Sequence, residues 1–280
     1  MRRLTLTFLL LTLAGFAAAQ VTVPQNAVAG EAASLSTSGS GSATLYLVGP
    51  GTSLKRDIKL GNSVPLTADD LAYAGRYTAI IDGQAQSFYV SPAKPQKLNF
   101  MARPSRLPVA QPNAISGAVF VLDHNDNLVT SPQQVKFEIG VNGAAPISQS
   151  ITTKDGIAYI RAASGKREGA STFTASVGDI TARRIVQQVA SDPCNLRMKA
   201  QRNGNVIALE TDPVRDCSGN PVPDGTIVTF IETSSQGKST VDARVKHGIA
   251  KATLPATPGT TLSVASGVVL GNEIHFGGQQ

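Results

Sequence analysis

The residues best suited to bind a metal ion lie in one short polar stretch. Asp123, Asn125, Asp126 and Asn127 carry carboxylate and amide oxygens, the ligand type that Ca²⁺ takes in proteins. An EF-hand loop also needs glycine at its sixth position and glutamate at its twelfth, and this stretch has neither. It therefore predicts a turn in which the Asp and Asn side chains bond nearby backbone groups. Calcium held between domains stays an open alternative.

The other potentially reactive side chains are dispersed. His124, His247 and His275 are isolated, whereas a zinc site needs three or four converging ligands. The serine-rich stretch 36–42 contains Gly39-Ser40-Gly41, but a nucleophile elbow needs Gly-x-Ser-x-Gly between a strand and a helix. This stretch predicts a hairpin loop instead. No paired carboxylates or phosphate-binding loop stand out, so we expect a protein that is not an enzyme, with no catalytic, cofactor-binding or metal-binding residue.

The chain has two cysteines, Cys194 and Cys217. An exported chain can oxidise such a pair, so we predict a disulfide between them. Closing a loop of this length contributes roughly 3 kcal/mol to stability in the chain-entropy model. Two free buried thiols are the alternative, and a redox-active pair is disfavoured because the two are not in a Cys-x-x-Cys arrangement.

Composition predicts the fold class. Of the 280 residues, 41% are hydrophobic and only 16% charged, against roughly 25% charged in an average globular domain. Thr, Ser and Val are plentiful, and long windows with helical periodicity are absent, which favours strands over solvent-facing helices. We expect an all-β protein built from sandwiches.

The N-terminus is typical of a secretory signal peptide. Arg2-Arg3 is followed by the apolar run Leu4–Gly15 and by the small residues Ala17–Ala19, the three parts of a cleavable leader. Residues 1–19 are therefore predicted to be removed. A membrane anchor is the alternative, but the apolar run is shorter than the roughly 20 residues that span a bilayer. We expect an exported protein, periplasmic or at the cell surface or extracellular, with no transmembrane segment after cleavage.

The charge of the mature chain is modest. Without Arg2 and Arg3, the 25 basic residues fall to 23 against 19 acidic residues, which leaves a net charge of +4. The basic side chains are scattered, whereas nucleic-acid binding calls for a concentrated basic face. We expect no nucleic-acid partner; a weak preference for anionic envelope polymers and a simple contribution to solubility explain the charge equally well.

Two short proline-containing breaks divide the mature chain. Ser91–Pro95 and Ala190–Cys194 separate strand-like runs and are typical of semi-stiff linkers. They predict three domains, 20–92, 93–190 and 191–280.

The second and third predicted domains are repeats of each other. Asp123 aligns with Asp216, and a phenylalanine follows each of them fourteen residues later, Phe137 and Phe230. Both rings fall at alternating strand positions that should face a core. Further matches pair 154–158 with 246–250 and 173–177 with 262–266. An ordered repeat of about 90 residues indicates tandem domains. The copy in the third domain keeps Asp216, Asn220 and Asp224 but not the other polar residues found after Asp123 in the second domain.

The first predicted domain differs from the repeats but has features of an immunoglobulin-like domain. Asp82-Gly83 is a strong signal for a two-residue hairpin turn. Tyr77, after Leu71–Arg76, resembles the tyrosine corner of immunoglobulin-like domains, in which the hydroxyl bonds back to the backbone. The expected strands are 21–23, 31–36, 44–48, 57–60, 64–66, 77–81 and 85–90.

Proline spacing predicts how the second domain begins. Arg103-Pro104, Leu107-Pro108 and Gln111-Pro112 follow one another at intervals of four. Because proline cannot donate to a strand ladder, this segment should be an edge strand or a crossover between two sheets.

The third domain resembles the bacterial immunoglobulin-like domains of the invasin and intimin class, through Asp216–Phe230, Gly248–Leu254 and Leu262–Ala265. The second domain matches the same pattern more loosely. Such domains serve as spacers, adhesin stalks and envelope scaffolds, so the resemblance implies an exported, non-enzymatic envelope protein that acts as a structural or protein-interaction module. Its partner would be an envelope protein or a surface polymer. A secreted or surface adhesin or glycan-binding protein is the alternative, mildly disfavoured by the absence of Trp and the presence of only five Tyr.

Overall fold

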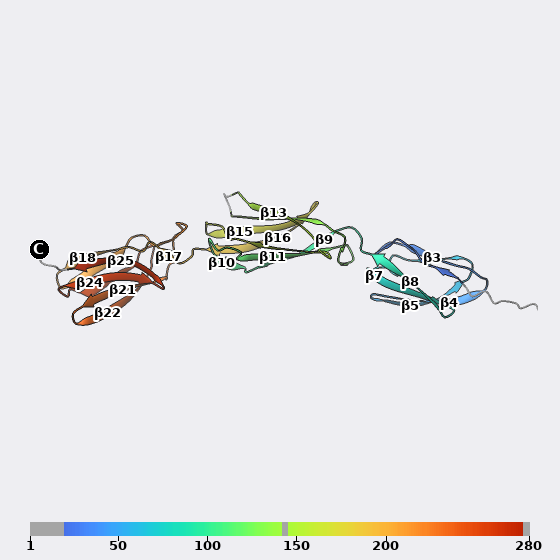
Figure 1. The fold of residues 1–280 in the computed structure, drawn as a ribbon, viewed down its shortest axis with the longest axis horizontal. Coiled ribbons are helices and arrows are strands. Elements are labelled where there is room, and N and C mark those ends of the chain that lie inside the picture. Colours follow the sequence, from blue (N-terminus) through green and yellow to red (C-terminus); the bar gives the residue numbers. More distant parts are fainter. Residues whose placement is uncertain (1–19, 142–144, 277–280) are drawn as a thin grey trace, which may run out of the picture. The chain divides into compact units, whose positions relative to one another are not determined.

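A computed structural model describes residues 20–141 and 145–276 (Figure 1). The predicted signal peptide at 1–19 lies outside the described residues. Within them the chain is all-β, as its composition predicts, with strands β1 to β25 and no helix. The described part accordingly holds no helix long and apolar enough to cross a membrane.

By their contacts the residues group into two units. Unit 1 contains the chain up to Lys97 together with Val121–Ser131, and unit 2 contains Leu98–Phe120 and the chain from Pro132 onward. The strands of the two units form three β-sandwiches, one in unit 1 and two in unit 2, and we number them in chain order. The domain limits 20–92, 93–190 and 191–280 stay predictions.

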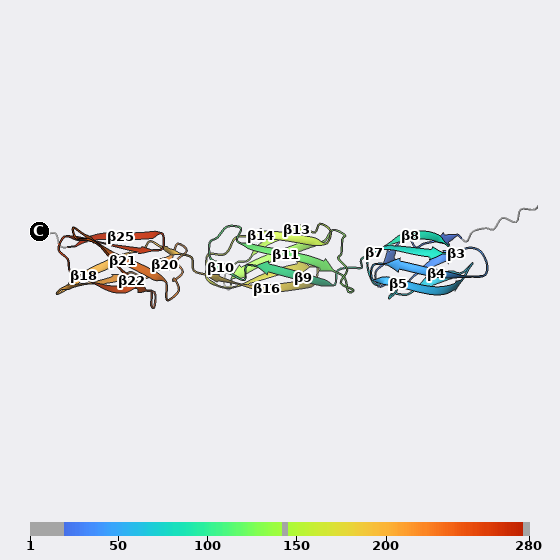
Figure 2. The same ribbon diagram turned by 90° about the horizontal axis from the view of Figure 1, so that it is seen from below.

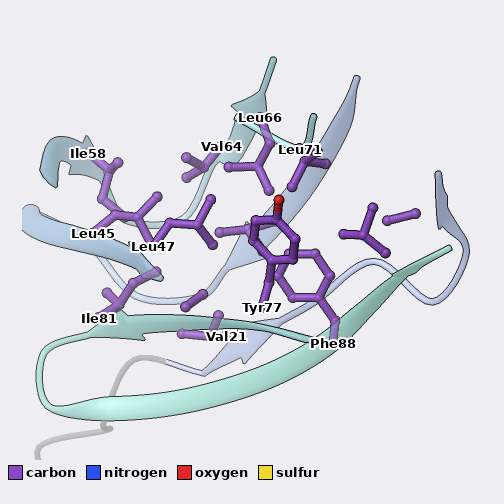
Figure 3. Close-up of a cluster of buried hydrophobic side chains, with 14 of the residues drawn as sticks. Val21, Leu45, Leu47, Ile58, Val64, Leu66, Leu71, Tyr77, Ile81 and Phe88 are labelled. Atoms are coloured by element: carbon purple, nitrogen blue, oxygen red, sulfur yellow. The ribbon is translucent and has the colours of Figure 1, made fainter. Parts of the chain in front are cut away.

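The first sandwich pairs a sheet of order β1-β3-β6 with a sheet of order β2-β8-β7-β4-β5. Its apolar side chains alternate along the strands, so one side of each sheet faces a common core. Tyr77, Leu45, Leu47 and Ile81 are fully buried there (Figure 3). The strands are β1 (Val21–Thr22), β2 (Ala27–Val28), β3 (Ala33–Thr37), β4 (Ser42–Gly49), β5 (Thr52–Lys59), β6 (Ser63–Leu66), β7 (Gly75–Ile81) and β8 (Gln84–Ser91).

Several expectations for this sandwich are confirmed and others need correction. β7 and β8 form the predicted hairpin, and both Asp82 and Gly83 have positive φ, 47° and 76°, as the two-residue turn requires. The prediction missed β2, because a two-residue strand leaves no periodic pattern, and found only the end of β5. The serine-rich stretch 36–42 is not a hairpin loop: its residues connect β3 to β4, which lie in different sheets.

The second sandwich combines a sheet of order β10-β16-β15-β12-β13 with one of order β14-β11-β9. Phe100, Phe137 and Phe173 meet in its core, with ring centroids 5.0 to 6.1 Å apart. Its strands are β9 (Lys97–Arg103), β10 (Arg106–Pro108), β11 (Ile115–Leu122), β12 (Gln134–Val141), β13 (Ile147–Thr152), β14 (Ile157–Ala162), β15 (Gly169–Val177) and β16 (Ile180–Val189).

The proline-rich segment behaves as its spacing predicts. β9 is an edge strand of one sheet and β10 is an edge strand of the other, so the chain crosses between the sheets at Pro104 and Ser105. Pro108 ends β10, at a sheet edge where its missing N–H costs no ladder bond.

The third sandwich, in which Figure 2 labels β18, β20, β21, β22 and β25, pairs a sheet of order β18-β19-β23 with one of order β22-β21-β24-β25. A short ladder joins β17 to β20. Its core contains Phe230, Ile207, Val228 and Leu262, all fully buried. Its strands are β17 (Pro193–Cys194), β18 (Met198–Asn203), β19 (Val206–Thr211), β20 (Arg215–Asp216), β21 (Ile227–Ser234), β22 (Gly237–Arg244), β23 (Lys251–Pro255), β24 (Thr260–Ser266) and β25 (Val269–Phe276).

The second and third sandwiches repeat each other in detail. Lys154 bridges Ile157 and Lys246 bridges Ile249, so the aligned segments form the same tight turn. In each turn the two central residues have positive φ: 50° and 79° in one, 53° and 81° in the other. The sequence repeat is therefore a structural repeat.

Candidate functional site

The polar loop Asp123–Asn127, which we call the first Asp–Asn loop, is organised around one buried carboxylate. Oδ1 of Asp123 accepts hydrogen bonds from the backbone N–H groups of Asn125 and Asn127, each at 2.9 Å. Oδ2 accepts one from the N–H of Ala93 at 3.0 Å. The Asn127 amide donates to both oxygens, at 3.2 and 3.0 Å. Asp123 is fully buried, and the predicted side-chain-to-backbone turn is confirmed.

Asn127 also reaches the first sandwich, which belongs to the same unit. Its Nδ2 donates to the carbonyl oxygen of Ala72 at 3.0 Å, and its Oδ1 accepts from the N–H of Ala74 at 2.9 Å. Asn125 adds a second bond to the Ala72 carbonyl, at 3.0 Å. The one amide therefore satisfies a donor and an acceptor of the segment between β6 and β7, as well as the carboxylate of Asp123.

The second Asp–Asn loop, Asp216–Asn220 in unit 2, has the same arrangement. Oδ1 of Asp216 accepts from the N–H groups of Ser218 and Asn220, at 2.8 and 2.9 Å, and Oδ2 accepts from the N–H of Ser191 at 3.0 Å. The Asn220 amide donates to both carboxylate oxygens, at 3.2 and 2.9 Å.

Asn220 again binds a backbone segment outside its own loop. Its Nδ2 donates to the carbonyl oxygen of Lys166 at 2.8 Å, and its Oδ1 accepts from the N–H of Glu168 at 3.1 Å. The bonded groups are two residues apart, as Ala72 and Ala74 are in unit 1. Both Asp–Asn loops therefore recognise the same pattern, a carbonyl followed two residues later by an N–H.

Each Asp–Asn loop also needs one residue in the left-handed region. The fourth position has φ of 65° at Asp126 and 87° at Gly219. Aspartate and asparagine tolerate this region better than other residues with side chains, and glycine tolerates it best. The first loop thus meets the requirement for a positive φ with aspartate, and the second loop meets it with glycine.

Hydrogen bonding sets the charge state of both carboxylates. Burial on its own would raise the pKa of Asp123, but the bonds from the Asn127 side chain and from three backbone N–H groups outweigh it, so the pKa lies below its ordinary value. The pKa of Asp216 is lowered against the same effect of burial by the Asn220 amide and by the N–H groups of Ser191, Asn220 and Ser218. Both aspartates are ionised at neutral pH.

The structure separates the other polar candidates. Asp224 accepts a bond from the N–H of His247 at 2.8 Å and takes no part in the second Asp–Asn loop. His275 bonds Thr261 on the neighbouring strand, and the backbone oxygen of His124 accepts from Lys97. Across the described residues, no group of three or more His, Cys, Asp or Glu side chains gathers to hold a metal ion.

The predicted structural residues lie at defined places. Cys194 and Cys217 are joined by a disulfide with a Cα–Cα distance of 4.9 Å, and Cys217 is the second residue of the second Asp–Asn loop. The hydroxyl of buried Tyr77 donates to the carbonyl oxygen of Tyr73 at 3.0 Å, which is the bond expected of a tyrosine corner. Phe137 and Phe230 lie buried in the cores of the second and third sandwiches.

The sequence reasoning missed the role of Asn127 and Asn220. It aligned the two loops and recognised their turns, but not the bonds that each amide makes beyond its own loop. The available signal was the Asp-x-x-x-Asn spacing common to both loops. The groups that receive these bonds are backbone atoms, which carry no residue-type signature.

Comparisons with known proteins place this fold among bacterial immunoglobulin-like proteins. No protein-family model and no curated protein sequence matches the chain. Among solved structures it is similar to FdeC, a broadly conserved Escherichia coli adhesin, with 15% identity, a TM-score of 0.63 and coverage of 93% of this chain and 97% of that one. InvD of Yersinia pseudotuberculosis gives 12% identity, a TM-score of 0.55 and coverage of 92% and 97%. The expected resemblance to invasin-type immunoglobulin-like domains is confirmed at the level of the fold.

Proposed function

We propose that this chain is an exported, non-enzymatic bacterial envelope protein that acts as a structural and protein-interaction module of tandem immunoglobulin-like domains. The observation that carries the proposal is the pair of equivalent Asp–Asn loops. Each bonds its carboxylate to the predicted linker and its amide to backbone groups of the preceding predicted domain. A module that must present surfaces at fixed spacing needs junctions of this kind.

The bonding pattern supports junctions that resist bending. The N–H groups of Ala93 and Ser191, which lie in the two predicted linkers, each bond a buried aspartate, and these bonds support linkers that are not free tethers. Buried hydrogen bonds to an ionised group are among the stronger ones in proteins, and losing one partner leaves the others unsatisfied. Because the same set of hydrogen bonds occurs at both predicted linkers, it supports a mechanical role for these bonds more than a purely local contribution to folding.

A second candidate function is adhesion at the cell surface. FdeC is described as an adhesin, and it matches nearly the whole of this chain in fold. An adhesin would use the same domains as a stalk and one exposed face for its ligand. Its ligand would lie outside the envelope, whereas a scaffold would have a stable envelope partner.

Crosslinking in intact cells, followed by affinity purification and mass spectrometry, tests the proposal. External protease accessibility is scored on the same cells. We expect one recurring envelope partner for the full chain, and loss of that partner in an Asn127→Ala/Asn220→Ala variant that is exported at the normal level. Asn203→Ala, at an exposed position in β18, is the matched control. An accessible or released protein with no stable envelope partner would overturn the scaffold proposal and favour adhesion.

A further inference from the structure

The outer face of the sheet β14-β11-β9 carries an uncovered apolar strip. Alternation along the strands turns Tyr159 and Ile157 of β14 outward, and the register pairs them with Ala118 and Phe120 of β11. Tyr159 is 51% exposed, Ile157 is 38% exposed, and Met101 on β9 is 48% exposed. All these residues belong to unit 2. Apolar surface of this kind, gathered on one sheet face, often marks a binding site.

The strip ends at a hollow that contains two arginines. This hollow has a volume of about 440 Å³ and is lined by Arg103, Arg161, Ser116, Asn113, Ser105, Pro104 and Ala114. Arg161 follows Tyr159 on the same outward row, and its Nε donates to the Tyr159 hydroxyl at 3.0 Å. That bond orients the guanidinium while leaving its two terminal nitrogens for a ligand. The Ser116 hydroxyl donates to the backbone oxygen of Arg103, which ties β9 to β11 at this point.

Nothing in the described structure neutralises this pair of charges. No acidic side chain lines the hollow. None of the ion pairs found among the described residues involves Arg103 or Arg161. Two uncompensated guanidinium groups beside serine and asparagine side chains suit an anion with oxygens in one plane, because an arginine fork matches a carboxylate in bidentate geometry.

From the arginine hollow and the apolar strip together, we propose that this face binds an acidic polysaccharide. A uronic-acid carboxylate occupies the hollow between Arg103 and Arg161, and the apolar faces of the adjoining sugar rings pack on Tyr159 and Ile157. Outward residues two apart on a strand lie about 7 Å from each other, so the strip from Arg161 to Ile157 accommodates more than one sugar unit.

The outer face of this sheet favours a saccharide over an extended peptide. The central strand, β11, is paired on both sides, so a peptide could add a strand only at the free edges of β9 and β14, in the plane of the sheet and not across its outer face. Recognition here must come from outward side chains, namely a ring with a polar tip, two guanidinium groups and small polar groups. Four of the five tyrosines, Tyr159 among them, are exposed. The low aromatic content therefore weighs less against glycan binding than the sequence suggested.

The test measures binding by the purified full-length mature chain with isothermal titration calorimetry, using a short oligogalacturonate as the probe. We expect binding that weakens as salt is added, because the charges are exposed. Arg103→Ala/Arg161→Ala should weaken it by at least about tenfold, and Tyr159→Ala should weaken it severalfold. Arg103→Lys/Arg161→Lys keeps the charge but not the planar guanidinium fork, so it should also weaken binding. It takes the place of the Ala variant in the test if the Ala variant proves unstable.

The matched control is Arg183→Ala/Arg184→Ala, which removes the same charge from exposed positions on β16 in the other sheet of this sandwich. We expect it to bind as the wild type does. The proposal is overturned if the wild type does not bind, if the control loses affinity equally, if Tyr159→Ala has no effect, or if an oligoglutamate of matched charge binds as tightly.

This inference deepens the adhesion candidate. Because it is tested on purified protein with both Asp–Asn loops intact, its failure leaves the scaffold proposal standing.

Discussion

The Asn220 side-chain amide lies between the Asp216 carboxylate and the backbone carbonyl oxygen of Lys166, with its Nδ2 2.9 Å from Oδ2 of the first and 2.8 Å from the second. One side chain thus satisfies an ionised group of its own loop and a carbonyl more than fifty residues away in the sequence. Alanine cannot make either bond, so a substitution at Asn220 tests directly how the second Asp–Asn loop holds the backbone at Lys166–Glu168.

Asn220→Ala should loosen the backbone near Glu168. The substitution leaves the Glu168 N–H and the Lys166 carbonyl without their partner, and because both residues are exposed, each lost bond is expected to contribute about 0.5–1.5 kcal/mol. Amide hydrogen exchange measured by NMR should show severalfold faster exchange at Glu168. Asn203→Ala should leave that rate unchanged. Equal protection of Glu168 in both variants would contradict a role for the Asn220 bond.

The stability conferred by Asp216 should depend on pH below about 4. The folded-state pKa of Asp216 is lower than its ordinary value of 3.8, so the unfolded chain binds the proton more tightly. The contribution is therefore complete above the unfolded pKa and is lost as pH falls through the folded pKa. In urea titrations between pH 2 and 6, the stability difference between the wild type and Asp216→Asn should narrow as pH falls. If the stability difference between the wild type and Asp216→Asn stays constant with pH, the charge of the Asp216 carboxylate is not the source of the stabilisation.

Removing the disulfide should destabilise the third sandwich. The bridge spans 23 positions of the sequence, and the chain-entropy model assigns about 3 kcal/mol to a loop of this size. Urea denaturation followed by circular dichroism should show this loss in Cys194→Ser/Cys217→Ser. Reductant should lower the stability of the wild type to a similar extent and leave the variant unaffected. If reductant changes neither protein, the bridge is not present in solution.

Tyr77→Phe should isolate the contribution of the tyrosine corner. Phenylalanine keeps the ring, which stacks on Phe88 with centroids 5.7 Å apart, and removes only the hydroxyl bond to Tyr73. A net loss of about 1 kcal/mol is expected for one such bond. Tyr89→Phe, at a position 55% exposed, should have almost no effect on the urea midpoint. The same midpoint for both variants would mean that the corner bond adds no stability.

Local signals explain why much of the fold was predictable. Asp82-Gly83 specifies its turn through the φ angles that two adjacent residues can adopt, and Tyr77 stands at a fixed distance from the segment that it bonds. Phe137 and Phe230 follow the period-two alternation of strands facing a core. Each of these inferences needs only neighbouring residues, so a single sequence contains the information.

Groups brought together from distant parts of the chain were not predictable. Arg103 and Arg161 come from β9 and β14, the two outer strands of a three-stranded sheet, and only the pairing of both with β11 places them around one hollow. Asn127 and Asn220 bind backbone atoms of segments whose sequences, Ala72–Ala74 and Lys166–Glu168, have no common feature. The serine-rich connection was misread for the same reason, since the sheet that a strand joins depends on its partners.

The parallel strand pairs determine how these sandwiches respond to tension. β2, near the start of the first sandwich, pairs in parallel with β8, its last strand, and β10 pairs in parallel with β16 in the second. Force that pulls the two strands of a parallel pair toward opposite ends loads all of their hydrogen bonds at once, in shear, whereas an antiparallel hairpin can open one bond at a time. In the third sandwich, where the strand pairs are antiparallel, the covalent bond from Cys194 to Cys217 prevents only the segment between these two residues from being extended. A protein exposed to flow or to a moving attachment would meet such loads, and the parallel pairs of the first two sandwiches would resist them.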